Sequence, residues 1–137
     1  GGPLVRRFYS FERLMDPAQL VDLKHWTNGL EGVLAHELPP RPVPSGGSPV
    51  RRPVNLDPGY VALDKVVLAT TKNSSHRLYL GRGIYGEVAL AYSHGRFEPQ
   101  PWTYPDYCSP DYSDFFLAAR QRLKGQFGFY SPGTARA

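Results

Sequence analysis

The hydrophobic and polar pattern of this chain is most regular between Asn55 and Val88. Tyr60–Thr70 carries branched apolar residues on both of its alternating faces, which predicts one central β-strand covered on two sides. His76–Leu80 and Ile84–Tyr92 flank a Gly-Arg-Gly sequence and predict a β-hairpin. We therefore expect three strands here, with connecting turns that converge on one site.

The hairpin has a register that pairs its charged residues. If Leu80 pairs with Ile84, counting back along both strands places Arg77 opposite Glu87. The face of this pair also carries two tyrosines, Tyr79 and Tyr85. The opposite face is apolar and is expected to join the core: Leu78, Leu80, Ile84 and Val88.

The N-terminal third predicts a strand followed by a helix. Leu4–Phe11 is rich in aromatic and branched residues, as a strand is. Pro17–His36 is predicted to be helical, because Asp16 can cap it and Gln19 can complete a capping box. Its mainly apolar face consists of residues at helical spacing: Leu20, Leu23, Thr27, Leu30 and Leu34.

The C-terminal third predicts an edge strand and a second helix. Arg96–Gln100 is a short strand pattern that prolines end. Ser109-Pro110 opens the last helix, which Gly125 is expected to stop, and its apolar stripe is Phe115, Phe116, Ala119 and Leu123. The predicted fold class is α+β, with a mostly antiparallel sheet of about four or five strands and two helices packed against it.

The length of 137 residues suits one domain over residues 1–137. Residues 37–53 are predicted to be a Pro-rich surface loop, because five prolines between Glu37 and Arg52 exclude a helix or a central strand. Residues 126–137 are expected to be a flexible tail. The chain has no initiator Met, so we expect a fragment whose natural start is missing.

Amino-acid composition says more about the cellular location of the protein than about its function. The single cysteine, Cys108, excludes an internal disulfide and a cysteine-rich zinc cage, which makes the cytoplasm the default location. No apolar run approaches the roughly 20 residues that span a bilayer, and no signal peptide opens the chain. The net charge of +4 favours an anionic partner and solubility equally, so charge alone does not choose between them.

A polar stripe borders the apolar face of the first helix. Lys24, Thr27, Asn28 and Glu31 recur at spacings of three and four residues, so they share one side of the helix. The stripe is either a solvated flank or the border of a ligand site. From spacing alone we favour the solvated flank.

Four motifs stand out together: NLDPGY at Asn55–Tyr60, TK at Thr71–Lys72, HRLYLG at His76–Gly81 and WTYPDY at Trp102–Tyr107. With them, the chain resembles the DUF4416 family of uncharacterised bacterial proteins, from Arg6 through the last helix. The stripe on the first helix matches the K..TN..E pattern of that family. The chain departs from the family at its Pro-rich loop, at Gly86 and at Cys108.

The resemblance implies no established activity, although some family members carry a GTP-binding label. The chain has no G-x-x-x-x-G-K-[ST] loop, which argues against a conventional GTPase. Gly81–Val88 has the form of a kinase glycine loop, but the lysine, H-R-D and D-F-G motifs of kinases are absent. A milder role remains for Gly81 and Gly83, whose backbone N–H groups could bind an anion.

Three cationic side chains, Lys72, His76 and Arg77, lie within six residues. Such a group suits a phosphate or carboxylate, because Arg binds it bidentately and Lys adds a point charge. An exposed basic turn is the plainer alternative. Lys24 and Asn28 are further candidates for the phosphate, through the family pattern.

Four carboxylates, Glu31, Asp57, Glu87 and Asp106, could hold Mg²⁺ or take a proton. Glu87 is the most informative, because a charge inside an apolar strand needs a partner. We expect Glu87, His76 and Asp57 to be the catalytic candidates, and Glu31, Glu87 and Asp57 the metal candidates.

Two functions follow from these residues. The first is a small soluble enzyme or binding protein for a nucleotide or another phosphorylated metabolite, whose base stacks on Trp102 or Tyr104. The alternative is a non-catalytic module that binds RNA or a protein through the same basic and aromatic face. We expect neither DNA nor a membrane as a partner.

Overall fold

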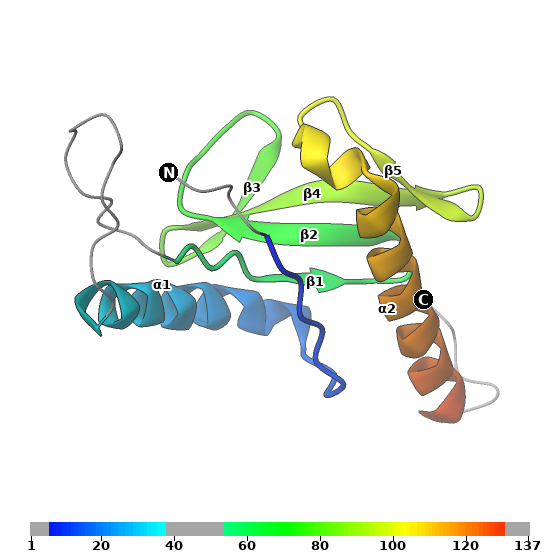
Figure 1. The fold of residues 1–137 in the computed structure, drawn as a ribbon, viewed down its shortest axis with the longest axis horizontal. Helices are drawn as coiled ribbons and strands as arrows, with labels where there is room; N and C mark the ends of the chain where they lie inside the picture. The colour runs from blue at the N-terminus through cyan, green and yellow to red at the C-terminus, as the bar shows by residue number, and fades with distance from the viewer. Residues whose placement is uncertain (1–5, 38–53, 131–137) are drawn as a thin grey trace. The chain divides into compact units, whose positions relative to one another are not determined.

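The computed structural model describes residues 6–37 and 54–130 (Figure 1). The chain falls into two compact units, residues 1–58 and 59–137, and each is described by itself. That the chain folds as a single domain stays a prediction. The Pro-rich loop lies outside the described residues except for Glu37, which ends a helix.

The first unit contains the predicted N-terminal helix. A short 3-10 turn, η1 (Pro17–Gln19), leads into α1 (Leu20–Glu37). The Asp16 carboxylate accepts a hydrogen bond from the backbone N–H of Ala18, and Gln19 Oε1 accepts one from the backbone N–H of Asp16. The capping box read from the sequence therefore fixes where this helix begins.

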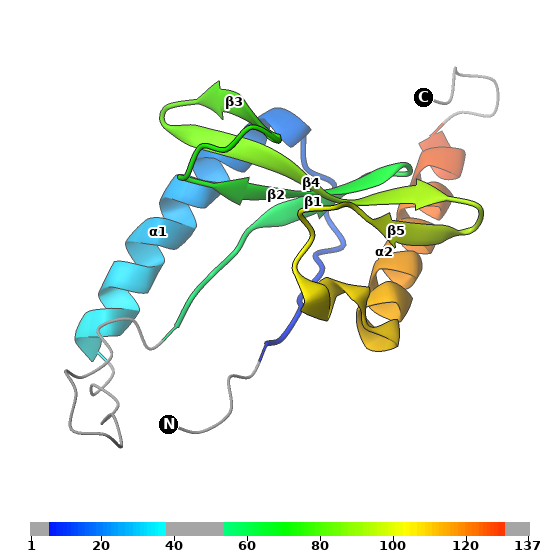
Figure 2. The ribbon, with the colours of Figure 1, turned by 90° about the horizontal axis from the view of Figure 1, so that it is seen from above.

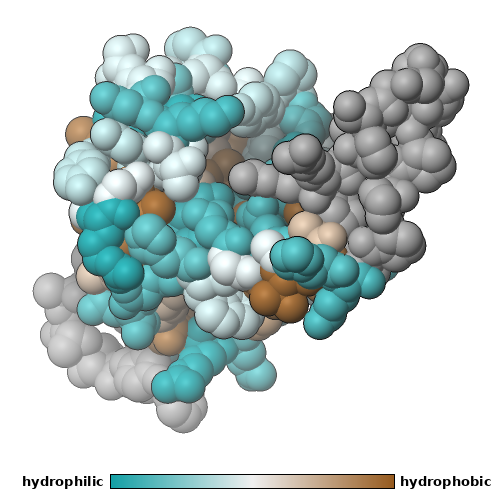
Figure 3. All heavy atoms as spheres, turned by 90° about the vertical axis from the view of Figure 1, so that its left-hand side faces the viewer, coloured by the Kyte–Doolittle hydropathy of each residue, from teal (hydrophilic) through white to brown (hydrophobic). Residues whose placement is uncertain are grey.

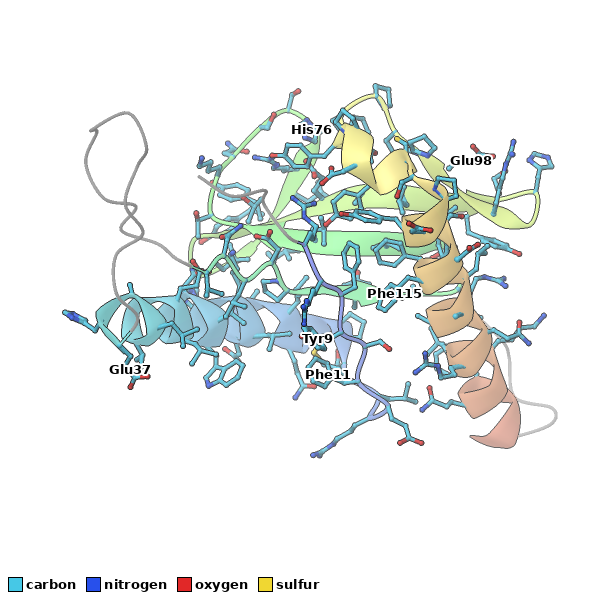
Figure 4. All side chains as sticks on the ribbon, viewed as in Figure 1. Tyr9, Phe11, Glu37, His76, Glu98 and Phe115 are labelled. Carbon is cyan, nitrogen blue, oxygen red and sulfur yellow. The ribbon has the colours of Figure 1, made fainter. Side chains whose placement is uncertain are left out.

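The expected strand at Leu4–Phe11 is not present over its described part, residues 6–11. Tyr9 and Phe11 are exposed there (Figure 4). A strand needs a neighbour for its backbone hydrogen bonds. The described part of the first unit contains no strand that could supply them. Aromatic and branched composition alone was therefore misleading.

The second unit is built on a five-stranded antiparallel sheet (Figure 1). Its main path is β1-β2-β4-β3, and β5 also pairs with β4. The strands are β1 (Gly59–Val61), β2 (Lys65–Thr70), β3 (Arg77–Gly81), β4 (Ile84–Ser93) and β5 (Arg96–Pro99). The core lies around β2, β4 and β5: Val66, Val67, Ala69, Ile84, Ala89, Leu90 and Phe97 are buried.

The run Tyr60–Thr70 forms two strands rather than the single predicted strand. The chain reverses at Ala62–Asp64, where the Ala62 N–H donates to the Lys65 carbonyl at 2.8 Å. The reversal places the exposed charge of Asp64 at a turn, where water reaches it. The second half, β2, is the expected central strand, between β1 and β4.

The β3–β4 hairpin has the predicted register over most of its length. Arg77 pairs with Glu87, Leu78 with Gly86 and Tyr79 with Tyr85. The pair expected between Leu80 and Ile84 is replaced by Gly81 and Ile84, which leaves Leu80 at a register shift. This bulge is confined to the turn end, so the charged pair is unaffected.

The predicted core face of the hairpin is only half correct. Ile84 on β4 is fully buried, but Leu78 and Leu80 on β3 are 76% and 43% exposed. The physical reason is position in the sheet, since β3 lies at its edge and, among the described strands, pairs with β4 alone. The core therefore covers β4 and ends before β3.

Helix α2 (Pro110–Tyr130) follows a 3-10 turn, η2 (Pro105–Cys108), and packs on β5. Phe116 is the buried centre of its predicted stripe and contacts Phe97 of β5 edge-to-face. The helix continues through Gly125 to Tyr130, so the predicted stop at Gly125 is wrong. That residues 126–137 form a flexible tail stays a prediction. A helical glycine costs about 1 kcal/mol, which does not end a helix that is packed elsewhere.

The protein is α+β, with an antiparallel sheet and two helices, as the sequence predicted. Packing of α2 on the sheet is part of this fold, whereas packing of α1 on it stays a prediction. Neither helix, over the described residues, is long and apolar enough to cross a membrane.

Candidate functional site

The candidate site lies on the free edge of β4, between two short strands. β2 pairs along one edge of β4, while β3 pairs with residues 84–87 and β5 with residues 90–93 on the other (Figure 2). Ala89 is an extra residue on β4, because Val66 pairs with Leu90 and Val67 with Val88. Ala89 and its neighbour Val88 thus lie in a gap between β3 and β5.

Side chains of the segment after β5 donate hydrogen bonds to the backbone carbonyl groups in this gap. Trp102 Nε1 donates to the Val88 carbonyl at 2.8 Å, and Thr103 Oγ1 donates to the Ala89 carbonyl at 2.5 Å. Thr103 Oγ1 also accepts from the Gln100 N–H at 2.7 Å. These bonds hold the Trp-Thr-Tyr segment against β4, because an unpaired carbonyl at a sheet edge would otherwise need water.

Glu87 is the charged centre of the site. It is 5% exposed, and its Oε1 atom accepts from Arg77 Nε at 3.1 Å and lies 2.5 Å from His76 Nε2. A buried carboxylate needs such charged or hydrogen-bonding partners to offset its desolvation. The sequence-based prediction that Glu87 needs a partner, and that Arg77 is one, is confirmed.

His76 is fixed on both ring nitrogens and on one face. Its ring stacks on Trp102 with centroids 4.8 Å apart and planes 13° apart, and its Nδ1 lies 3.2 Å from Ser74 Oγ. Figure 4 shows His76 just before β3, beside the segment that leads into η2. Trp102 thus has one ring face on His76, so as a platform for a base it has at most the other face.

Arg77 links the buried pair to the preceding basic turn. Its Nη1 donates to the Lys72 carbonyl at 3.0 Å while its Nε holds Glu87. The Lys72 side chain is exposed on the same turn. Lys72, His76, Arg77, Glu87 and Trp102, all predicted site residues, are therefore brought together around one end of β3.

The glycine turn lies at the other end of β3. Gly81 lies four residues after Arg77 along the strand, about 13 Å at 3.3 Å per residue. The Gly83 N–H donates to the Tyr79 hydroxyl at 3.1 Å, so it is not free for an anion. Positive φ angles at both glycines and at Arg82 show that this sequence serves a tight turn. Tyr104, the second predicted stacking residue, is exposed just before η2.

The other predicted site residues belong to the first unit. Lys24, Thr27 and Glu31 are buried and Asn28 is half-buried, so the interpretation of this stripe as a solvated flank is wrong. The buried face of α1 consists of Leu20, Lys24, Thr27 and Glu31, and two of these polar side chains have hydrogen-bond partners. Glu31 Oε1 accepts from the Leu56 N–H at 3.4 Å, and Thr27 Oγ1 donates to the Lys24 carbonyl at 3.0 Å.

Asp57 is exposed in the first unit, and its carboxylate accepts from Asn55 Nδ2 at 3.1 Å. Its catalytic and metal roles stay predictions. Across residues 6–37 and 54–130, no group of three or more His, Cys, Asp or Glu side chains is arranged to hold a metal ion. Glu87 in particular faces the Arg77 guanidinium and the His76 imidazole rather than other carboxylates.

Sequence reasoning missed two hydroxyl residues of the site, Ser74 and Thr103. Ser74 lies in a stretch, TKNSS, that signals only a polar turn. Its position two residues before a histidine is the signal that could have found it, since Ser and Thr hydroxyls commonly bond groups two residues away. Thr103 carries no such signal, because its partner is 14 residues away in β4.

Comparisons with curated proteins and with solved structures give no match. The family model described as "Domain of unknown function (DUF4416)" matches residues 1–123. This match covers α1, the whole sheet and most of α2, including every residue of the candidate site. The chain therefore belongs to the DUF4416 family.

Proposed function

We propose that the protein binds a small phosphorylated molecule, such as a nucleotide, at the His76 end of β3. The observation that carries this proposal is the fixed guanidinium of Arg77. Two of its nitrogens are bound, Nε by Glu87 and Nη1 by the Lys72 carbonyl. Within residues 6–37 and 54–130 its Nη2 atom has no hydrogen-bond partner, so a rigidly held donor remains for an anion.

Two neighbouring groups add positive charge and donors. The Lys72 ammonium is exposed and has no ion pair with the described residues. Its flexible stem lets it reach a phosphate that Arg77 holds, and charge-assisted hydrogen bonds of this kind are the strong ones. The modest positive charge of the chain helps such an anion approach.

The Glu87–His76 pair gives this site a proton-transfer group. A carboxylate that holds one imidazole nitrogen fixes the ring and its tautomer, which leaves the other nitrogen to accept a proton. That arrangement supports an enzyme rather than a passive binder. Mg²⁺ is the metal to test, because a phosphate supplies the oxygen ligands that it prefers.

RNA binding is the second candidate, and exposed aromatic residues favour it. Tyr79 on β3 and Tyr104 before η2 are both exposed, at 62% and 57%. Aromatic rings beside cations on a sheet stack with unpaired bases. Hydrophilic side chains cover most of the surface in Figure 3, with hydrophobic ones in separate spots, so a broad apolar interface is not seen on that face.

The test is a thermal-shift screen of mononucleotides and inorganic phosphate, with and without Mg²⁺. A ligand at 100 times its Kd stabilises the folded state by about 2.7 kcal/mol. Lys72→Gln should weaken binding about tenfold, which is the loss of about 1.4 kcal/mol from one charged contact. Lys124→Gln is the matched control, since Lys124 is exposed on α2 and its substitution removes the same charge away from the site.

Equal weakening by both lysine variants would show a non-specific charge effect and contradict the proposal. Single-stranded RNA is titrated in parallel at two salt concentrations. Tight RNA binding with a steep salt dependence, together with no shift by mononucleotides or phosphate, would favour the second candidate.

A further inference from the structure

The hydroxyl group of a serine contacts the second ring nitrogen of His76. Ser74 Oγ lies 3.2 Å from Nδ1, and Glu87 Oε1 lies 2.5 Å from Nε2. An ionised carboxylate only accepts hydrogen bonds, so Nε2 carries the ring proton and Nδ1 is left to accept from the Ser74 hydroxyl. The three side chains thus form one continuous line of hydrogen bonds.

We infer that Ser74 is a nucleophile, that His76 removes its proton, and that Glu87 is the positioning residue for His76. A weakly acidic hydroxyl becomes nucleophilic when a base within hydrogen-bond reach is itself oriented by a third group. Both conditions are met here. The inference rests on the proposed function, because Arg77 and Lys72 would hold the phosphate that Ser74 attacks.

The surroundings keep this line of hydrogen bonds rigid. Trp102 stacks on the imidazole ring, and Glu87 is also bound to Arg77, which is half-buried. The Arg77 N–H donates to the Ser74 carbonyl at 3.1 Å, which closes the turn that carries Ser74. Since this bond uses the backbone of Ser74, the hydroxyl is not needed to form the turn.

The chain contains a natural comparison for Ser74. Ser93 Oγ lies 2.7 Å from His94 Nδ1, so it makes the same kind of contact. His94, however, is exposed, and no carboxylate of the described residues is bound to its other ring nitrogen. Ser93 therefore has a base without a positioning residue, and it should remain an ordinary hydroxyl.

The reaction class is phosphoryl transfer from a phosphate ester through the serine. The Ser74 Oγ–P bond forms as the bond from phosphorus to the leaving oxygen breaks, and the Ser74 proton passes through His76 Nδ1 to that leaving oxygen. Water then attacks phosphorus and gives a proton to His76, which passes it to Ser74 Oγ as the Oγ–P bond breaks, so that phosphate and the free serine are released. Arg77 and Lys72 would stabilise charge on the phosphoryl oxygens.

A fluorophosphonate ester tests the inference without knowledge of the natural substrate. Attack by Ser74 forms an Oγ–P bond and releases fluoride, and the proton leaves through His76, so intact mass and peptide mapping detect the adduct. We expect labelling at Ser74 and none at Ser93 in the wild-type protein. Ser74→Ala should abolish it, Ser93→Ala should not change it, and His76→Gln should slow it about 100-fold.

No adduct at Ser74, or labelling of Ser74 no faster than that of Ser93, would overturn the inference. Labelling of Ser74 at the same rate in His76→Gln would also overturn it. Should His76→Gln fail to fold, the comparison of Ser74 with Ser93 within the wild-type protein decides the question alone.

The positioning role of Glu87 has its own readout. The ¹⁵N NMR signals of the His76 ring report which nitrogen is protonated, and we expect the Nε2–H tautomer in the wild-type protein. Glu87→Ala, which removes the acceptor, should lose this preference, whereas Arg77→Gln, which breaks the ion pair but leaves the carboxylate, should keep it. Loss in both variants would indicate a merely structural role.

The two proposals can fail separately. Ser74→Ala removes the hydroxyl and no charge, so it should leave the affinity for a mononucleotide or for inorganic phosphate within about twofold. Phosphate binding without an adduct would contradict the role of Ser74 as a nucleophile but would still support the proposed binding site. An adduct at Ser74 in a protein that binds no phosphate would contradict the proposed function.

Discussion

Replacing Glu87 by glutamine tests the centre of the site directly. The substitution keeps the shape of the side chain and removes its charge. It leaves Arg77, whose side chain is 15% exposed, without an anionic partner. Removing one partner of a buried ion pair costs about 3–5 kcal/mol, and the amide oxygen of glutamine can still accept from Arg77 Nε. We expect a loss of about 2 kcal/mol, near the value of hydrogen bonds to charged groups.

The matched control is Glu98→Gln. Glu98 lies on β5 and binds Arg96 Nε at 2.7 Å, but the side chains of Glu98 and Arg96 are 37% and 70% exposed. Exposed pairs contribute roughly 0–1 kcal/mol because water screens them. The two substitutions therefore remove the same chemical group from the same sheet and differ in burial.

Urea unfolding measures both variants against the wild type. We expect Glu87→Gln to lower the urea concentration at the unfolding midpoint with an unchanged slope. In thermal unfolding it should lower the Tm by roughly 8 °C, at about 4 °C per kcal/mol. Combining it with Arg77→Gln should give a coupling energy of about 1–3 kcal/mol. A loss in Glu87→Gln no larger than in Glu98→Gln would refute the buried charged centre.

Three further substitutions test other parts of the structure. Gly125→Ala should stabilise the protein by about 0.5–1 kcal/mol in urea unfolding, because alanine favours the helix that runs through this position; destabilisation would indicate that Gly125 ends the helix. Gly59→Ala should cost about 1–3 kcal/mol by the same assay, since its added Cβ would meet the Val67 carbonyl oxygen. Gly32→Ala on α1 is the control, because an added Cβ there meets open space. Equal effects of the two substitutions would contradict the β1–β2 pairing. Trp102→Phe should keep the ring on His76 and lose the bond to Val88, for a cost of about 1 kcal/mol in thermal unfolding; no change would mean that this bond does not hold the segment.

Local chemistry determined several elements from the sequence by itself. The start of α1 followed from Asp16, Pro17 and Gln19, because a capping box needs only neighbouring residues. The hairpin register followed from the glycine turn and from the period of the strands, which placed Arg77 opposite Glu87. A charge inside a strand had to find a partner, and the cross-strand position supplied it.

Tertiary structure decided what depends on the neighbours of each element. It divided Tyr60–Thr70 into two strands, and it exposed Leu78 at a sheet edge that composition cannot identify. It placed Trp102 on His76 and Thr103 on β4, because the bulge at Ala89 and the gap between β3 and β5 exist only in the folded sheet. Sequence therefore named most of the charged residues of the site, while their assembly around one imidazole ring required the fold.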